Sequence, residues 1–154
     1  MPIYETNKDR RNQQGVFEEL RPLLGIQHFL ELPRLNIYDY KIWIGTTWVK
    51  PKKQRTKAQC EKAFLEIKCY NAWLGQYGSK TFCREEKFLR AKKQPEGVGV
   101  LYAVRYWDAL FVWDLKTVVP TARLAQPRRD RPENDWVVQL DQRDAVHQWW
   151  TTLI

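Results

Sequence analysis

Lys62-Ala-Phe-Leu-Glu-Ile-Lys-Cys-Tyr70 is an apolar, β-prone run with two charged residues near its centre, Glu66 and Lys68. The run predicts a strand, and side chains two apart in a strand share a face, so Glu66 and Lys68 should point the same way. Leu65 and Ile67 should point the other way, toward a helix or core. Charged groups in such a strand cost free energy unless they are paired or bound to a metal.

The preceding strand is predicted over Asn36–Gly45, a β-branched and aromatic segment. Alternation places Asp39 on the face opposite Tyr38 and Tyr40. If this strand pairs antiparallel with the next one, Asp39 lies beside Glu66. Two neighbouring carboxylates repel each other, and a cation between them removes the conflict.

Asp39, Glu66 and the backbone carbonyl of Ile67 would form half of a coordination shell that suits Mg²⁺ or Mn²⁺. A metal held in this way can activate water and stabilise charge on a phosphate, which fits phosphodiester hydrolysis. Lys68 would orient the water or neutralise the phosphate. The alternative is that Glu66 and Lys68 form an exposed ion pair worth about 0–1 kcal/mol.

Periodicity predicts a helix over about Asn7–Leu24 that ends at Gly25, and a second helix from Ser79 to about Lys93. The other strands are expected at Ile26–Leu32, Val98–Trp107, Leu110–Leu115 and Trp136–Leu140. Residues 120–135 read as irregular, and Asp141 is expected to cap a short helix that contains Trp149 and Trp150. The fold class is therefore α/β (α+β), a central mixed sheet flanked by helices in the order helix-strand-strand-strand-helix-strand-strand. We expect one domain over 1–154, with a basic loop at 46–59 and an irregular tail at 117–154.

The charge distribution points to a polyanionic partner. The 154-residue chain carries a net charge of +8, and residues 50–93 alone account for a net +9. We expect the basic loop, and a stripe at i, i+4, i+7 spacing on the second helix, to hold DNA through Lys50, Lys52, Lys53, Arg55, Lys57, Lys80, Arg84 and Lys87. The alternative is a solvated basic loop with no partner.

The cysteines Cys60, Cys69 and Cys83 form no Cys-x-x-Cys pair, and His28 and His147 lie far apart in the sequence. This argues against a zinc site and favours reduced thiols in a cytoplasmic protein. No apolar run reaches the roughly 18 residues of a membrane helix, and the first residues do not resemble a secretory signal.

The order of these motifs resembles the PD-(D/E)xK nuclease superfamily, and most closely its small phage and prophage members. The resemblance covers most of the chain. It is carried by Tyr4-Glu5-Thr6 with Asp9, Arg10 and Asn12, by Leu35-Asn-Ile-Tyr-Asp-Tyr40, by Phe64-Leu-Glu-Ile-Lys-Cys69, by Thr81 with Lys87, and by Arg128–Val138.

The resemblance implies a restriction-endonuclease-like fold, with Asp39 and Glu66 as metal ligands and Lys68 as the catalytic lysine. Tyr38 stands where the motif has proline. Many members add a glutamate from the first helix, and here that position is Gln13, whose amide can hold a water ligand but supplies no charge. Asp9 could substitute for it, as could Glu18 or Glu19.

We therefore expect a Mg²⁺-dependent DNA nuclease in the cytoplasm, which would be the host's if the protein is phage-encoded. One alternative is a nucleic-acid-binding protein on the same fold with no catalysis, and another is a small phage protein that binds a host protein. Among the tryptophans, Trp48 and Trp73 are candidates for stacking on unpaired bases, although core or rim positions are the commoner use. Trp149 and Trp150 would pack or mediate self-association as a homodimer.

Overall fold

The computed structural model describes residues 7–33, 36–45, 60–77, 80–127, 130 and 132–150. In chain order its elements are α1 (Asn7–Leu24), β1 (Ile26–Glu31), β2 (Tyr40–Gly45), β3 (Cys60–Cys69), the 3-10 turn η3 (Leu74–Tyr77), β4 (Lys80–Arg84), α2 (Glu85–Lys92), β5 (Val98–Arg105), β6 (Ala109–Asp114), β7 (Ala122–Gln126), β8 (Asp135–Asp141), the 3-10 turn η4 (Gln142–Asp144) and β9 (His147–Trp150). The basic loop expected at 46–59 lies outside the described residues. Within the described part, neither helix combines the length and the apolarity needed to cross a membrane.

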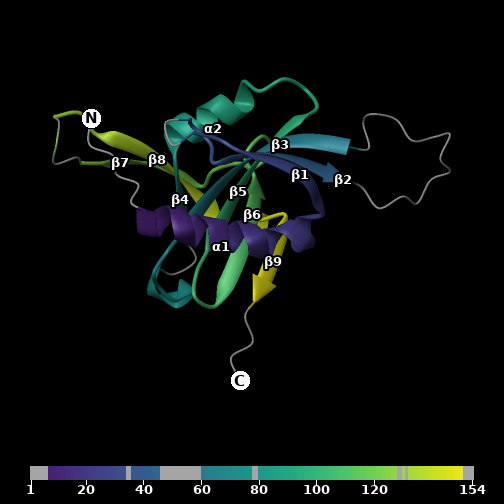
Figure 1. The fold of residues 1–154 in the computed structure, drawn as a ribbon. Helices are drawn as coiled ribbons and strands as arrows, with labels where there is room; N and C mark the ends of the chain where they lie inside the picture. Colours follow the sequence, from purple (N-terminus) through teal and green to yellow (C-terminus); the bar gives the residue numbers. More distant parts are fainter. Residues whose placement is uncertain are drawn as a thin grey trace.

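A six-stranded mixed sheet forms the centre of the molecule, with the strand order β1-β2-β3-β5-β6-β9 (Figure 1). β3 and β5 run parallel, and every other neighbouring pair in this sheet is antiparallel. The segment between β3 and β5 contains β4 and α2. β4 pairs with β8, and β8 with β7, in a second sheet of three strands. The mixed α/β class predicted from the sequence is confirmed.

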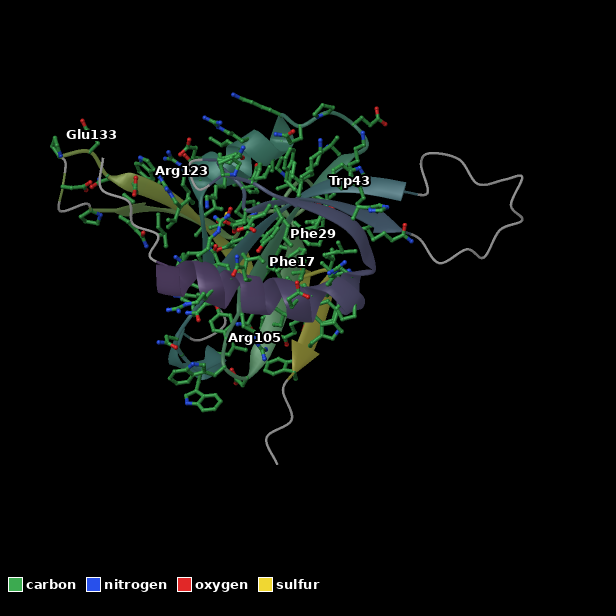
Figure 2. The ribbon with its side chains drawn as sticks, viewed as in Figure 1. Phe17, Phe29, Trp43, Arg105, Arg123 and Glu133 are labelled. Carbon is green, nitrogen blue, oxygen red and sulfur yellow. The ribbon has the colours of Figure 1, made fainter. Side chains whose placement is uncertain are left out.

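Helix α1 covers one face of the central sheet, as Figure 1 shows. Its apolar stripe includes Phe17 and Leu20, which pack with Leu65 and Ile67 of β3. Leu65 and Ile67 therefore point toward a helix, as alternation along the strand predicted. In Figure 2, Phe17 lies beside Phe29 of β1, and their ring centroids are 4.8 Å apart. The helix ends where expected, at Gly25, whose φ of +68° suits a residue without a Cβ.

The opposite face of the central sheet packs against α2 and the small sheet. The apolar residues buried on this side come from α2, the small sheet and the central sheet. They include Phe88 of α2, Cys83 of β4, Leu140 of β8 and Trp113 of β6. The charged residue Glu66 of β3 is buried on the same side as Tyr102, its partner in the parallel pairing with β5. A polar side chain is thus enclosed between the sheet and α2.

The helix predicted from Ser79 to Lys93 is wrong in its first half, because residues 80–84 form strand β4. Thr81 and Cys83 are buried whereas Lys80 and Arg84 are exposed, a period of two that reflects pairing with β8. Lys80, Arg84 and Lys87 consequently do not form one stripe on a helix. Only Lys87 lies on α2.

The segment after residue 117 is more regular than predicted. Strand β7 lies in the stretch expected to be irregular, and Trp149 and Trp150 belong to strand β9 instead of a helix. Pairing of β9 with β6 explains this difference, since it extends the central sheet. The strand near Trp136–Leu140 is confirmed as β8, and Asp141 does cap a short turn by accepting a 2.8 Å hydrogen bond from the Arg143 N–H.

Candidate metal and nucleic-acid site

A bend over residues 36–39 sets the position of Asp39. The strand predicted from Asn36 begins only at Tyr40, because the Asn36 side chain accepts a 3.3 Å hydrogen bond from the Tyr38 N–H and turns the chain. Tyr38 is buried among the apolar residues on the α2 side of the central sheet, whereas Tyr40 is buried among those on the α1 side. The prediction that these two tyrosines share a face is therefore wrong, since strand alternation does not hold through a bend.

The backbone of Asp39 is held on both sides. Its carbonyl accepts a 2.9 Å hydrogen bond from the Leu32 N–H, and its own N–H donates to the Leu65 carbonyl at 3.1 Å. The Asp39 carboxylate in turn accepts a 2.7 Å hydrogen bond from the Ile67 N–H. The predicted antiparallel pairing of β2 with β3 is confirmed, and where β2 bends away the Asp39 side chain takes the place of a strand carbonyl.

Gln13 of α1 contacts the same residue of β3, Ile67. Its Nε2 donates a 3.4 Å hydrogen bond to the Ile67 carbonyl. The N–H and C=O of one strand residue point toward the same neighbouring strand, so Asp39 and Gln13 meet at one peptide segment. The structure thus brings together three of the predicted site residues, Asp39, Ile67 and Gln13.

The other acids proposed for the first helix do not take this position. Glu18 is exposed, and Glu19 pairs with Arg105 at 3.4 Å. The Asp9 side chain lies outside the described residues. Gln13 is therefore the residue that α1 supplies to the Ile67 carbonyl in the described part of the chain.

Glu66 is the buried acid of the site, with only 6% of its surface exposed. Its Oε1 forms an ion pair with the Lys87 ammonium of α2, while its Oε2 is buried without a hydrogen-bond partner. Burial raises the pKa of Glu66 to about 7, Lys87 opposes this rise, and the nearby Asp39 charge adds to it. The negative charge of Asp39 therefore acts on Glu66 in the direction of repulsion.

Lys87 has a role that its place in the sequence did not indicate. It was predicted to contact nucleic acid, whereas its ammonium faces Glu66 and its carbonyl accepts a 3.0 Å hydrogen bond from the Tyr38 hydroxyl. An acid inside an apolar strand signals that a cation must be near. Spacing along the chain could not identify this cation, because it lies 21 residues away on an element predicted with the wrong boundaries.

Lys68 is exposed, on the same side of β3 as Glu66 by strand alternation. Its ammonium lies 5.9 Å from the ring centroid of Tyr70. Lys80 and Arg84 are exposed on β4, where Arg84 approaches Glu86 at 3.7 Å. The remaining predicted contacts, Lys50, Lys52, Lys53, Arg55 and Lys57, lie outside the described residues, as does Trp48.

The donor set suits a hard cation but is small. Within the described ranges, no group of three or more His, Cys, Asp and Glu residues is placed to hold a metal. The site offers two carboxylates, from Asp39 and Glu66, and the Ile67 carbonyl. The buried, unsatisfied Oε2 of Glu66 fits a divalent ion, because oxygen ligands are the ones that Mg²⁺ and Mn²⁺ prefer.

Comparisons of the chain with protein-family models, with curated proteins and with solved structures find no significant match.

Proposed function

We propose that the protein is a metal-dependent nuclease that hydrolyses phosphodiester bonds of DNA. One observation carries the proposal, namely the Glu66 carboxylate, which is buried, leaves one oxygen unsatisfied and is subject to the negative charge of Asp39. Burial of an acid near the charge of a second, half-buried acid is costly unless a cation compensates for it. Lys87 supplies one positive charge. A second cation, bound by Asp39, Glu66 and the Ile67 carbonyl, would balance the site.

Each residue of the chain has a distinct task in this proposal. A bound Mg²⁺ or Mn²⁺ would supply an activated water and stabilise negative charge on the phosphate. Lys87 holds Glu66 in place from the α2 side. Gln13 orients the Ile67 carbonyl from the α1 side. Lys68, exposed at the end of β3, binds the phosphate oxygens of the substrate.

The second candidate is a protein of the same fold that binds nucleic acid without cleaving it. Two observations favour it. Gln13 contributes a neutral amide where a third carboxylate would strengthen metal binding, and Lys87 already neutralises one oxygen of Glu66. This candidate predicts DNA binding with no divalent-dependent cleavage.

The test is incubation of the wild-type protein with linear and circular DNA in Mg²⁺, Mn²⁺ or chelator. We expect cleavage only with a divalent ion. Glu66→Ala and Asp39→Ala should each lower the cleavage rate by at least about 100-fold, because no neighbouring group can replace a lost carboxylate ligand. Glu86→Gln is the matched control, because Glu86 is an exposed acid on α2. The same digestion by wild type and Glu66→Ala would mean that this site does not cleave DNA.

A second readout separates metal binding from activity. The melting temperature should rise with Mn²⁺ in the wild type and in Glu86→Gln, but not in Glu66→Gln. A rise without cleavage would show that the site holds the metal but does not hydrolyse DNA. Absence of any rise contradicts the proposed ligands.

A further inference from the structure

Two tryptophans are exposed together where β3 and β5 end. Trp73 follows β3 and Trp107 follows β5. Trp73 is 41% exposed and Trp107 is 46% exposed. The ring centroids are 5.2 Å apart and the ring planes meet at 79°, an edge-to-face pair. Exposure of so much aromatic surface at one place is costly in water and marks a contact surface.

Hydrogen bonds between the two connections fix this pair. The Trp107 N–H donates to the Ala72 carbonyl at 3.0 Å, and the Trp107 indole N–H donates to the Asn71 side chain at 3.2 Å. The Leu74 N–H donates to the Asp108 carboxylate at 3.0 Å. The two backbone segments and the Trp107 indole are therefore held in place, which lowers the entropy that a ligand binding there would have to remove.

The Trp73–Trp107 pair follows the carboxyl ends of β3, which carries Glu66, and of its neighbour β5. β3 and β5 are parallel, so their carboxyl ends reach one edge of the central sheet. In Figure 2, the label of Arg105, the last residue of β5, marks this end below α1. Cys69, the last residue of β3, lies three positions beyond Glu66, which corresponds to about 10 Å of strand. The exposed Lys68 lies between them.

We infer that Trp73 and Trp107 stack on unpaired nucleobases, which makes single-stranded DNA the preferred substrate class of the proposed nuclease site. The inference rests on the proposed function for its link to cleavage. Every base has a π-face that an indole can cover, whereas duplex bases already cover one another. Charge complementarity favours nucleic acid over a protein partner, since Lys68 is exposed on β3 five residues before Trp73 and the chain carries a net charge of +8.

The test is binding of labelled oligonucleotides, measured by fluorescence anisotropy in chelator so that no cleavage occurs. We expect the wild type to bind an oligo-dT strand more tightly than a duplex of the same length. Trp73→Ala and Trp107→Ala should each weaken binding to the single strand by about 5- to 100-fold and leave duplex binding unchanged. Trp107→Phe should restore part of the affinity, because phenylalanine keeps an aromatic face. An abasic strand should bind the wild type as weakly as oligo-dT binds the variants.

Trp136→Ala is the matched control, because Trp136 is also 41% exposed but lies on β8, where it packs against Arg123. Circular dichroism of each variant checks that it is folded. Unchanged affinity for the single strand in both Trp73→Ala and Trp107→Ala would overturn the inference and favour a protein partner at this surface. Equal losses for single strand and duplex would overturn it as well. If the wild type cleaves no DNA but the stacking variants lose single-strand affinity, the stacking inference holds and the nuclease proposal fails.

Discussion

At the residue scale, Glu66 couples the candidate site to the stability of the protein. Its carboxylate is enclosed between β3 and α2, and Lys87 compensates for only part of the cost of burial. The pKa of about 7 expresses this balance, since it means that the folded chain holds the Glu66 proton more tightly than an unfolded chain does. The folded protein therefore bears the free-energy cost of burying this carboxylate.

This balance predicts a pH dependence of stability in chelator. The pKa of Glu66 is raised from 4.5 to about 7, so its contribution to stability is complete below about pH 4.5 and is lost as the pH rises through about 7. Urea unfolding of the wild type should therefore give a free energy of unfolding that falls from pH 5 to pH 8. Glu66→Gln should reduce this fall, because an amide does not ionise.

Glu86→Gln serves as the comparison, since Glu86 is exposed. It should keep the slope of the wild type. If Glu66→Gln has the same slope as the wild type, Glu66 does not titrate as the structure indicates.

The sequence predicted part of this site for a physical reason. Asp39, Glu66 and Ile67 were predicted to lie together from antiparallel pairing of the two strands. That pairing is present up to Tyr40 and Leu65, and where β2 has bent away the Asp39 carboxylate accepts from the Ile67 N–H. The bend at Asn36 could not be predicted, since it depends on one side chain accepting from the Tyr38 N–H. Lys87 was missed as the partner of Glu66 because that contact joins two layers of the fold.

At the element scale, α1 and β4 show what periodicity can and cannot identify. The apolar stripe of α1 runs from Val16 to Leu24, about 2.5 turns, and is followed by a glycine, so the end of this helix was predicted correctly. β4 and α2 were predicted as one helix because basic residues recur at i, i+4, i+7 spacing across both. A strand of only five residues is too short for its alternation to outweigh that pattern. Only the pairing of β4 with β8, distant in sequence, shows that Thr81 and Cys83 are buried strand residues.

The stripe of α1 predicts a difference between two leucines. Leu20 is fully buried against the central sheet, whereas Leu23 is 42% exposed. Leu20→Ala should lower the free energy of unfolding by about 2–5 kcal/mol, because it leaves a cavity in the core. Leu23→Ala removes the same atoms from a site in contact with water and should cost less than about 1 kcal/mol. Urea unfolding measures both, and equal losses would show that α1 does not pack on the sheet through this face.

At the scale of the whole molecule, charge determines how a polyanion would meet the protein. The net charge of +8 arises from residues 50–93, and in the described part of that range Lys68, Lys80 and Arg84 are exposed. These three residues come from β3 and β4, which belong to different sheets. A nucleic acid bound to all three would span both sheets.

Binding should accordingly depend on salt. If these three side chains each neutralise one phosphate of a single strand, they contribute about −2 to the slope of log affinity against log salt. This corresponds to roughly a 20-fold loss for a four-fold increase in salt. The variant with Lys68→Gln, Lys80→Gln and Arg84→Gln should lose that part of the slope in anisotropy titrations. Arg143→Gln is the control, since the Arg143 side chain is 89% exposed but lies on η4. Weak binding with no salt dependence would instead support the third possibility, a protein that binds a host protein.

The place of β8 at the centre of the small sheet has a consequence for synthesis on the ribosome. β8 is the only strand that joins β4 to β7 in this sheet, as the described residues show. Roughly 50 residues separate β4 from β8, so at usual rates of translation β4 emerges about 3–10 s before its partner exists. During that interval the backbone groups of β4 are open to other chains, and a nascent polypeptide of this kind gains most from a chaperone at that moment.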